Sequence, residues 1–172
     1  LSNAATENDF IDFYNKINTN NNINNIGMFA EPKFDGLAVN INYENGLYHN
    51  ATTRGDGHVG EDVTQNVKTI KSLPMVIDNT SLPKKFSIRG EVFIDKKDFT
   101  EINQELRIKK QKEYSNPRNL AAGSIRQLDP AVANSRRLRL FLHGIAETDS
   151  FINFKKHSDL FAHFNNIGFP IN

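Results

Sequence analysis

The chain has 172 residues, which suits one domain, or one large piece of a domain, with a buried core. Its formal net charge is +1 and it contains no cysteine. The charge balance gives no argument for nucleic-acid binding over the whole surface, and the lack of cysteine excludes disulfides and cysteine-ligated zinc. No apolar run approaches the length of a membrane span, so we expect no membrane partner.

The first predicted element is an amphipathic helix over residues 6–17. Thr6 can cap this helix, and apolar side chains then recur at helical spacing: Phe10, Phe13, Tyr14 and Ile17. Residues 18–25 are rich in asparagine and favour no packed core, which predicts a connector.

An antiparallel hairpin follows the connector. Residues 36–43 alternate apolar and polar side chains, Asn45-Gly46 comes next, and residues 47–54 supply the return strand. Asn-Gly is the strongest short hairpin signal because both positions tolerate positive φ. Further helices are predicted over 61–70, 95–111 and 153–168, and further strands over 86–94 and 138–146, the last of them buried. Helices interspersed with antiparallel strands predict an α+β fold with mixed or antiparallel sheets flanked by helices.

Three glycines after the hairpin match a dinucleotide-binding pattern. Gly55, Gly57 and Gly60 spell G-x-G-x-x-G, and a predicted helix follows them. That fingerprint requires a parallel β-α-β unit, whereas here the preceding strand is the second arm of a hairpin. We therefore expect the glycines to make a tight turn, or to let a loop approach a ligand.

The stretch EPKFDGLA places Glu31, Lys33 and Asp35 at a spacing of two residues. In an extended segment all three side chains point to the same side. They form either a surface ladder of ion pairs or a nucleophilic lysine with supporting groups. Carboxylates alone favour the protonated form of a lysine, so for a nucleophile they must bind a metal, orient the amine or contact a ligand.

Two later segments place charged residues where packing is expected. Arg89 and Glu91 share one face of the predicted strand 86–94. Arg118 and Arg126 flank the small residues of the segment NPRNLAAGSIRQLDP. Arginine suits phosphate as a forked donor, which points to a nucleotide or a DNA backbone. The alternative is a helix packed tightly against the sheet with arginines at its rim.

Taken together, the motifs resemble the adenylation (nucleotidyltransferase) domain of bacterial NAD-dependent DNA ligases. EPKFDGLAV resembles the K-x-D-G motif of that family with its preceding glutamate. The next blocks resemble those of the family in order and spacing: TRGDGHVGEDVTQNVKTIKSLP, RGEVFI and NPRNLAAGSIRQLDP. K-x-D-G is shared with ATP-dependent ligases and capping enzymes, whereas the last block is specific to the NAD-dependent group.

The resemblance implies a nucleotidyltransferase fold and a chemical role for the lysine. Lys33 would attack the α-phosphate of NAD, release nicotinamide mononucleotide and carry AMP as a phosphoramidate. Asp35 and Gly36 would complete the nucleophile motif, and Glu31 would contact the adenine. Magnesium would assist the transfer, although the resemblance assigns no metal ligand.

Other matched positions would bind nucleotide or DNA. Arg54 would hold the ribose-phosphate region, and Glu91 would contact the ribose or help to place the metal. Arg118 and Arg126 would engage phosphates of nucleotide or DNA. The AMP would then pass to the 5′-phosphate of nicked double-stranded DNA, in replication and repair. The resemblance also implies a monomer that works in the cytoplasm.

The resemblance covers residues 1–172 as part of an adenylation domain. Residues 1–25 would lead into a nucleotide-binding core formed by residues 26–172. The family's N-terminal domain and later lysine motif have no match here, so we expect this chain alone to be incomplete for the full reaction. One alternative is a non-catalytic nucleotide- or DNA-binding module. Another is an ATP-dependent ligase or a capping-type enzyme.

Overall fold

The structure is a computed structural model that describes residues 3–21, 26–57, 59–78, 82–148 and 154–171. The chain divides into two compact units, Leu1–Ala30 and Glu31–Asn172. No helix among the described residues combines the length and the apolar character needed to cross a membrane.

The first unit contains helix α1 (Glu7–Asn21). Its start is a reciprocal cap, because the Thr6 hydroxyl accepts a hydrogen bond from the backbone N–H of Asp9 while the Asp9 carboxylate accepts from that of Thr6. These bonds hold the pKa of Asp9 below its usual value. The predicted helix is confirmed, but it continues to Asn21. The connector prediction is therefore wrong for residues 18–21, and residues 22–25 lie outside the described residues.

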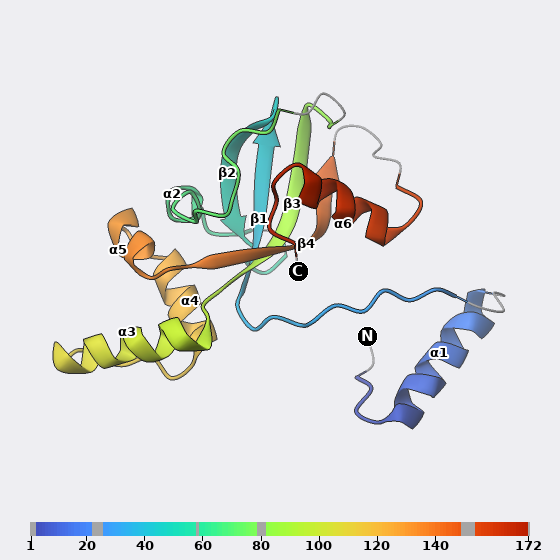
Figure 1. Ribbon diagram of the computed structural model, residues 1–172, viewed down its shortest axis with the longest axis horizontal. Helices are drawn as coiled ribbons and strands as arrows, with labels where there is room; N and C mark the ends of the chain where they lie inside the picture. Colours follow the sequence, from blue (N-terminus) through green and yellow to red (C-terminus); the bar gives the residue numbers. More distant parts are fainter. Residues whose placement is uncertain (1–2, 22–25, 58, 79–81, 149–153, 172) are drawn as a thin grey trace. The chain divides into compact units, whose positions relative to one another are not determined.

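The second unit is built on a four-stranded antiparallel sheet (Figure 1). Its strands are β1 (Leu37–Glu44), β2 (Leu47–Thr53), β3 (Lys85–Phe93) and β4 (Arg139–Thr148), in the spatial order β2-β1-β3-β4. The α+β prediction is confirmed, and every pairing in this sheet is antiparallel.

The predicted Asn-Gly turn joins β1 to β2. Asn45 and Gly46 have φ values of 50° and 76°, which are the positive angles of a type I′ hairpin turn. A Cβ on Gly46 would lie 2.4 Å from the carbonyl oxygen of Ile77, so the turn also requires glycine for space. A local signal in the sequence is enough to fix this hairpin.

The helices of the second unit are α2 (Thr64–Val67), α3 (Lys96–Ile108), α4 (Pro117–Ile125), α5 (Pro130–Ser135) and α6 (His157–Asn166). The helix predicted over 61–70 is a single turn. The first residues of the predicted helix are instead held against β2, where the N–H of Val63 donates to the carbonyl of Ala51 at 2.9 Å.

The strand predicted over 138–146 is present, but it is not buried on both faces, because Arg139 and His143 are exposed.

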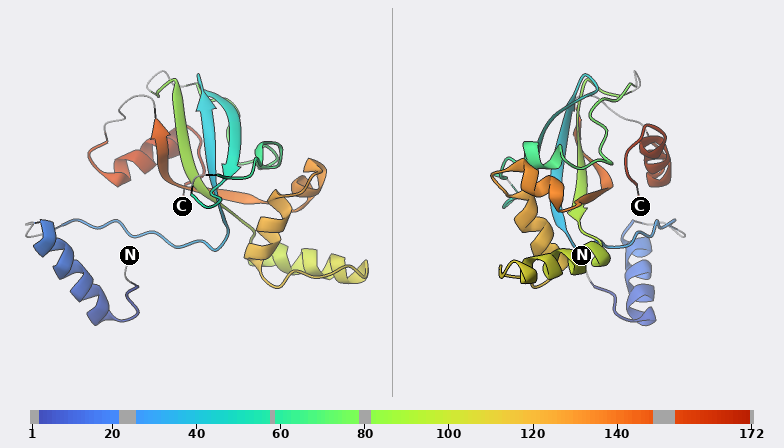
Figure 2. Two further views of the ribbon diagram at one scale, coloured as in Figure 1. Left: turned by 180° about the vertical axis from the view of Figure 1, so that it is seen from behind. Right: turned by 60° about the vertical axis from the view of Figure 1, so that its left-hand side comes forward.

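One face of the sheet carries the core and the other is polar. On the core face, Val39 and Ile41 of β1 and Ile88 of β3 are completely buried, and they belong to one cluster with side chains from the helices: Val67, Leu120, Ile125 and Phe164. The opposite face presents Asn40, Asn42, Arg89 and Glu91, as the alternation of side chains along paired strands requires. In this unit, helices α3, α4 and α5 gather at the end of the sheet where β1 begins and β3 ends (Figures 1 and 2).

Tyr43 provides a test of the core. Its ring stacks on Phe86 with centroids 5.2 Å apart, and its hydroxyl donates to the carbonyl of Pro74 at 2.6 Å. Burial raises the pKa of Tyr43 far above its usual value. We expect Tyr43→Phe to lower the free energy of unfolding by about 1 kcal/mol, because the mutation leaves a carbonyl without its donor while the ring packing stays. Urea denaturation measures the change, with Val76→Ala at an exposed position as the control.

Candidate functional site

Antiparallel topology brings four chain segments to one end of the sheet. This end of the sheet is formed by the start of β1, the end of β2, the end of β3 and the start of β4 (Figure 1). The segments adjoining these strand ends carry most of the residues that the sequence marks as functional: 31–36, 54–61 and 91–95. Helix α4, which carries the two arginines of the NPRNLAAGSIRQLDP segment, contacts β3 and β1.

Lys33 lies on an irregular segment that is anchored to the sheet by two residues just after it, Phe34 and Gly36. Residues 31–35 are not part of a strand, contrary to the extended strand considered from their spacing. The centroid of the Phe34 ring lies 4.9 Å from the ring centroid of Phe93 and 4.6 Å from that of Phe141. Phe34 thus packs on the sheet, while its neighbours Lys33 and Asp35 are exposed.

Gly36 forms the second anchor. Its N–H donates to Oε1 of Glu91 at 3.1 Å, and a Cβ at this position would lie 2.1 Å from the carbonyl oxygen of Val92. Glu91 is only 9% exposed. Its other oxygen, Oε2, lies 3.4 Å from Nε2 of His143 on β4. The lysine segment is therefore attached to β3 by a contact that only glycine permits.

The carboxylates near Lys33 have other basic side chains as partners. Oδ1 of Asp35 lies 3.2 Å from a guanidinium nitrogen of Arg118, and Oε2 of Glu31 lies 3.6 Å from Nε2 of His157. Within the part of the chain that the structure describes, the ammonium of Lys33 has no ion-pair partner. The surface ladder considered from the sequence is therefore wrong, because neither neighbouring carboxylate bonds the lysine.

Arg118 and Arg126 lie at the two ends of α4. Leu120, Ala121, Ser124 and Ile125 are buried on its packed side. Nε of Arg126 lies 2.5 Å from Oε2 of Glu61, so both arginines bond carboxylates here. This arrangement is the tightly packed helix with arginines at its rim, which the sequence left open as an alternative.

The glycine-rich segment after β2 is a tight loop. A Cβ on Gly55 would lie 1.7 Å from the carbonyl oxygen of Val59, and one on Gly60 would lie 1.9 Å from that of Thr53. With the antiparallel sheet, this confirms that the three glycines are not a dinucleotide fingerprint. Arg54 begins the loop and is exposed, and its N–H donates to the carbonyl of Ala38 at the start of β1.

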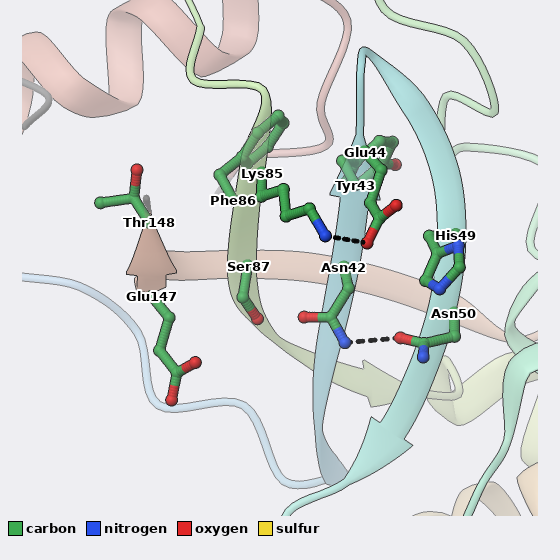
Figure 3. A pocket seen from close by; sticks show the side chains of 10 residues that line it. All are labelled: Asn42, Tyr43, Glu44, His49, Asn50, Lys85, Phe86, Ser87, Glu147 and Thr148. Atoms are coloured by element: carbon green, nitrogen blue, oxygen red, sulfur yellow. Dashed lines mark hydrogen bonds and ion pairs between the residues drawn. The ribbon is translucent and has the colours of Figure 1, made fainter. Parts of the chain in front are cut away.

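A shallow depression of about 450 Å³ lies at the other end of the sheet (Figure 3). In Figure 3 the side chains of Asn42 and Asn50 point toward one another and are joined by a hydrogen bond, and Lys85 pairs with Glu44. The residues predicted to act do not line this depression. Ser87, which does line it, shares a face of β3 with Arg89 and Glu91, so the polar face extends from the depression toward the lysine segment.

The described side chains contain no group of three or more His, Asp or Glu placed to hold a metal ion. Magnesium in phosphoryl-transfer sites is bound through one or two carboxylates together with substrate phosphates and water. Asp35 and Glu91, which flank Gly36, are the carboxylates that fit such a shared site.

Comparison with known proteins identifies the domain. A family model described as the NAD-dependent DNA ligase adenylation domain matches residues 1–172. The chain belongs to this family. A protein named DNA ligase from Buchnera aphidicola subsp. Cinara cedri (strain Cc) is 44% identical over 149 residues, which cover 87% of this chain. The chain spans about a quarter of the length of that relative.

Membership of the NAD-dependent DNA ligase adenylation family confirms the resemblance found in the motifs and favours the NAD-dependent group over ATP-dependent and capping enzymes. Sequence reasoning singled out Glu31, Glu91 and Arg126, but it missed three polar residues that bond these side chains or the adjoining backbone: Asn66, His143 and His157. The asparagine gives no local signal, and the histidines are recognisable only once the strands and α6 bring them to Glu91 and Glu31.

We expect Gly36→Ala to destabilise the protein by at least about 2 kcal/mol, because the new methyl group would overlap the backbone of Val92. Chemical denaturation measures this loss. Gly27→Ala is the matched control, since a Cβ there meets nothing within 4 Å. Equal stability of the two variants would contradict the close approach between Gly36 and β3.

The Arg118–Asp35 pair should contribute little to folding. Its side chains are 53% and 75% exposed, and surface pairs of this kind contribute at most about 1 kcal/mol. Arg118→Gln should therefore shift the free energy of unfolding by less than that amount. Thermal and urea unfolding of the variant test this expectation, and a larger loss would mean that Arg118 serves the fold rather than a ligand.

Proposed function

We propose that the chain accepts AMP from NAD on Lys33. The ammonium of Lys33 first releases a proton to water, and the neutral Nζ then attacks the α-phosphorus of NAD and forms a P–N bond. The bond from that phosphorus to the bridging oxygen breaks, nicotinamide mononucleotide leaves with the electron pair, and Nζ loses a second proton to water. The product is a lysyl-AMP phosphoramidate, which splits one difficult transfer to DNA into two easier steps.

The observation that carries the proposal is the state of the lysine. Lys33 is exposed and unpaired among the described residues, although it lies between two carboxylates. His157 and Arg118 hold those carboxylates, so the amine is left available to the negatively charged phosphates of a nucleotide. The anchoring of Phe34 and Gly36 fixes the segment and reduces the entropy lost when the reacting atoms meet.

The other residues would bind the nucleotide around this amine. Glu31 would contact the adenine and Glu91 the ribose, as oxygen acceptors close to the lysine segment. Arg54, exposed beside the start of β1, would contact the ribose-phosphate region. Arg118 and Arg126 would exchange their carboxylate partners for phosphates, which can accept forked hydrogen bonds from a guanidinium.

Magnesium would be held between the nucleotide phosphates and the carboxylates of Asp35 or Glu91. It would supply charge neutralisation on the transferred phosphoryl group. The task of this chain is to place the amine, the arginines and the acceptors so that few groups reorganise during transfer.

The lysyl-AMP would next pass to the 5′-phosphate of nicked double-stranded DNA, whose 3′-hydroxyl then displaces AMP and seals the nick. This activity belongs to DNA replication and repair, and a cytoplasmic monomer would meet both NAD and DNA. In this proposal, residues 26–172 form the nucleotide-binding core and residues 1–25 lead into it.

Intact mass measurement tests the proposal. The chain is incubated with magnesium and either NAD or ATP, with Lys33→Ala and Lys33→Arg alongside. We expect an increase equal to one AMP with NAD alone, and none in either variant, because arginine keeps the charge but is never deprotonated in proteins.

Each result separates the candidate functions. An adduct with ATP alone would contradict the NAD assignment and favour the capping-type alternative. No adduct with either nucleotide, together with saturable nucleotide binding, would favour a non-catalytic binding module. An adduct that survives in Lys33→Ala would show that another residue accepts the AMP.

A further inference from the structure

Asn66 makes two hydrogen bonds that enclose one of the proposed phosphate-binding arginines. It lies on α2 and is 6% exposed. Its Nδ2 donates to the carbonyl of Ile125 and to the carbonyl of Gln127, both at 2.7 Å. These carbonyls belong to the residues directly before and after Arg126. One amide group therefore holds the chain on both sides of this arginine.

The backbone needs such a partner at this point because α4 ends here. The last carbonyls of a helix have no partner within the helix. The side chain of Gln127 satisfies the carbonyl of Gly123, and the N–H of Arg126 bonds that of Ser124. Asn66 supplies the donor for the carbonyl of Ile125 from a separate element of the chain.

The amide oxygen of Asn66 has no hydrogen-bond partner within the described residues. A buried polar group without a partner is costly. An apolar side chain at this buried position would avoid that cost but could not bond the two carbonyls. What the asparagine contributes is therefore its pair of donors, which both go to the turn around Arg126.

The segment that carries Asn66 also holds the other end of the arginine. The carboxylate of Glu61, five residues earlier, accepts a hydrogen bond from Nε of Arg126 at 2.5 Å. Its own backbone is bonded to Thr53 of β2 in both directions, at 2.9 and 3.0 Å. Residues 61–66 thus hold Arg126 by its backbone through Asn66 and by its guanidinium through Glu61.

The support behind this segment is itself fixed. Val63 donates to the carbonyl of Ala51 on β2, and the hydroxyl of Thr64 accepts from the N–H of Ala51 at 3.1 Å. The carboxylate of Asp62 accepts from the N–H of Thr64 at 2.8 Å, and its bonds with Thr64 hold the pKa of Asp62 below its usual value. Asn66 is therefore attached to the sheet and can impose a position on α4.

We propose that Asn66 is a positioning residue for Arg126. It holds the turn at the end of α4 so that the guanidinium is presented beside the glycine-rich loop, where a phosphate can replace Glu61. The phosphate part of this inference rests on the proposed function, whereas the positioning itself does not.

The test uses the Nε–H group of Arg126 in proton-nitrogen NMR spectra of the full chain. The Arg126→Lys variant lacks the Nε–H group, so the signal that disappears is that of Arg126. The Glu61→Ala variant gives the rate at which this Nε–H exchanges with water when the carboxylate is absent. In Asn66→Ala we expect the rate of exchange with water to rise at least about fivefold, the factor that loss of one ordinary hydrogen bond produces. Asn66→Ser can donate to only one carbonyl, so it should raise the exchange rate of the Arg126 Nε–H by a smaller factor. This variant replaces the alanine variant in the test if the alanine variant does not fold.

Asn103→Ala is the matched control. The Asn103 amide also bonds the backbone of a loop residue. It donates to the carbonyl of Tyr114 and accepts from the N–H of Tyr114, both at 2.9 Å, but it does not touch Arg126. Its variant should leave the exchange of the Arg126 signal unchanged. Folded Asn66 variants with wild-type exchange, or an equal rise in Asn103→Ala, would overturn the proposal.

Adenylation provides a second readout. Asn66→Ala should slow lysyl-AMP formation, and adding it to Arg126→Ala should cause no further loss, since its effect acts through the arginine. Additive losses would overturn the positioning role. A wild-type chain that forms no lysyl-AMP would contradict the proposed function alone, because the exchange measurement involves no nucleotide.

Discussion

Gly36 lies so close to β3 that a side-chain methyl group would fall 2.1 Å from the carbonyl oxygen of Val92. Without a side chain, its N–H reaches the buried carboxylate of Glu91. Two residues earlier, Phe34 packs against the rings of Phe93 and Phe141. Both contacts lie just after Lys33, and they determine where the chain carries this side chain into solvent.

The charges around the lysine follow from this arrangement. Each nearby carboxylate has a basic partner from another element: Glu31 with His157, Asp35 with Arg118, and Glu91 with His143. Among the described residues the Lys33 ammonium has no ion-pair partner, and the carboxylates beside it are already bonded, which suits it to an anionic ligand. Phosphates satisfy that requirement, and the match to the NAD-dependent DNA ligase adenylation family agrees with it.

Helix α4 brings the arginines to this end of the sheet. Its small residues allow close packing, since Ala121 and Ser124 are almost completely buried. Arg118 and Arg126 are then presented at opposite ends of a short helix, each already bonded to a carboxylate oxygen. The helix therefore has the packing role that the sequence presented as one alternative, and we propose a binding role for its arginines beside it.

The sequence by itself determined the features that depend on near neighbours. Asn45-Gly46 fixed the hairpin because only residues that tolerate positive φ fit its turn, and the alternation of β1 and β3 fixed which face is buried. The motif around Lys33 indicated a candidate site, and with the later blocks it indicated the family that the comparison shows. Local patterns were less reliable at element ends, since α2 shrinks to one turn where β2 captures its first residues.

Only the tertiary structure decided the partners. Arg118 and Asp35 are 83 residues apart in the chain, Arg126 and Glu61 are 65 apart, and the Asn66 amide bonds a carbonyl 59 residues away. Periodicity within a segment cannot encode such pairs, because they depend on which strand ends share an edge and on how α2 and α4 pack beside it. The residue types of the candidate site were therefore readable from the sequence. Their pairing, and hence the lack of an ion-pair partner for Lys33 within the described part of the chain, required the fold.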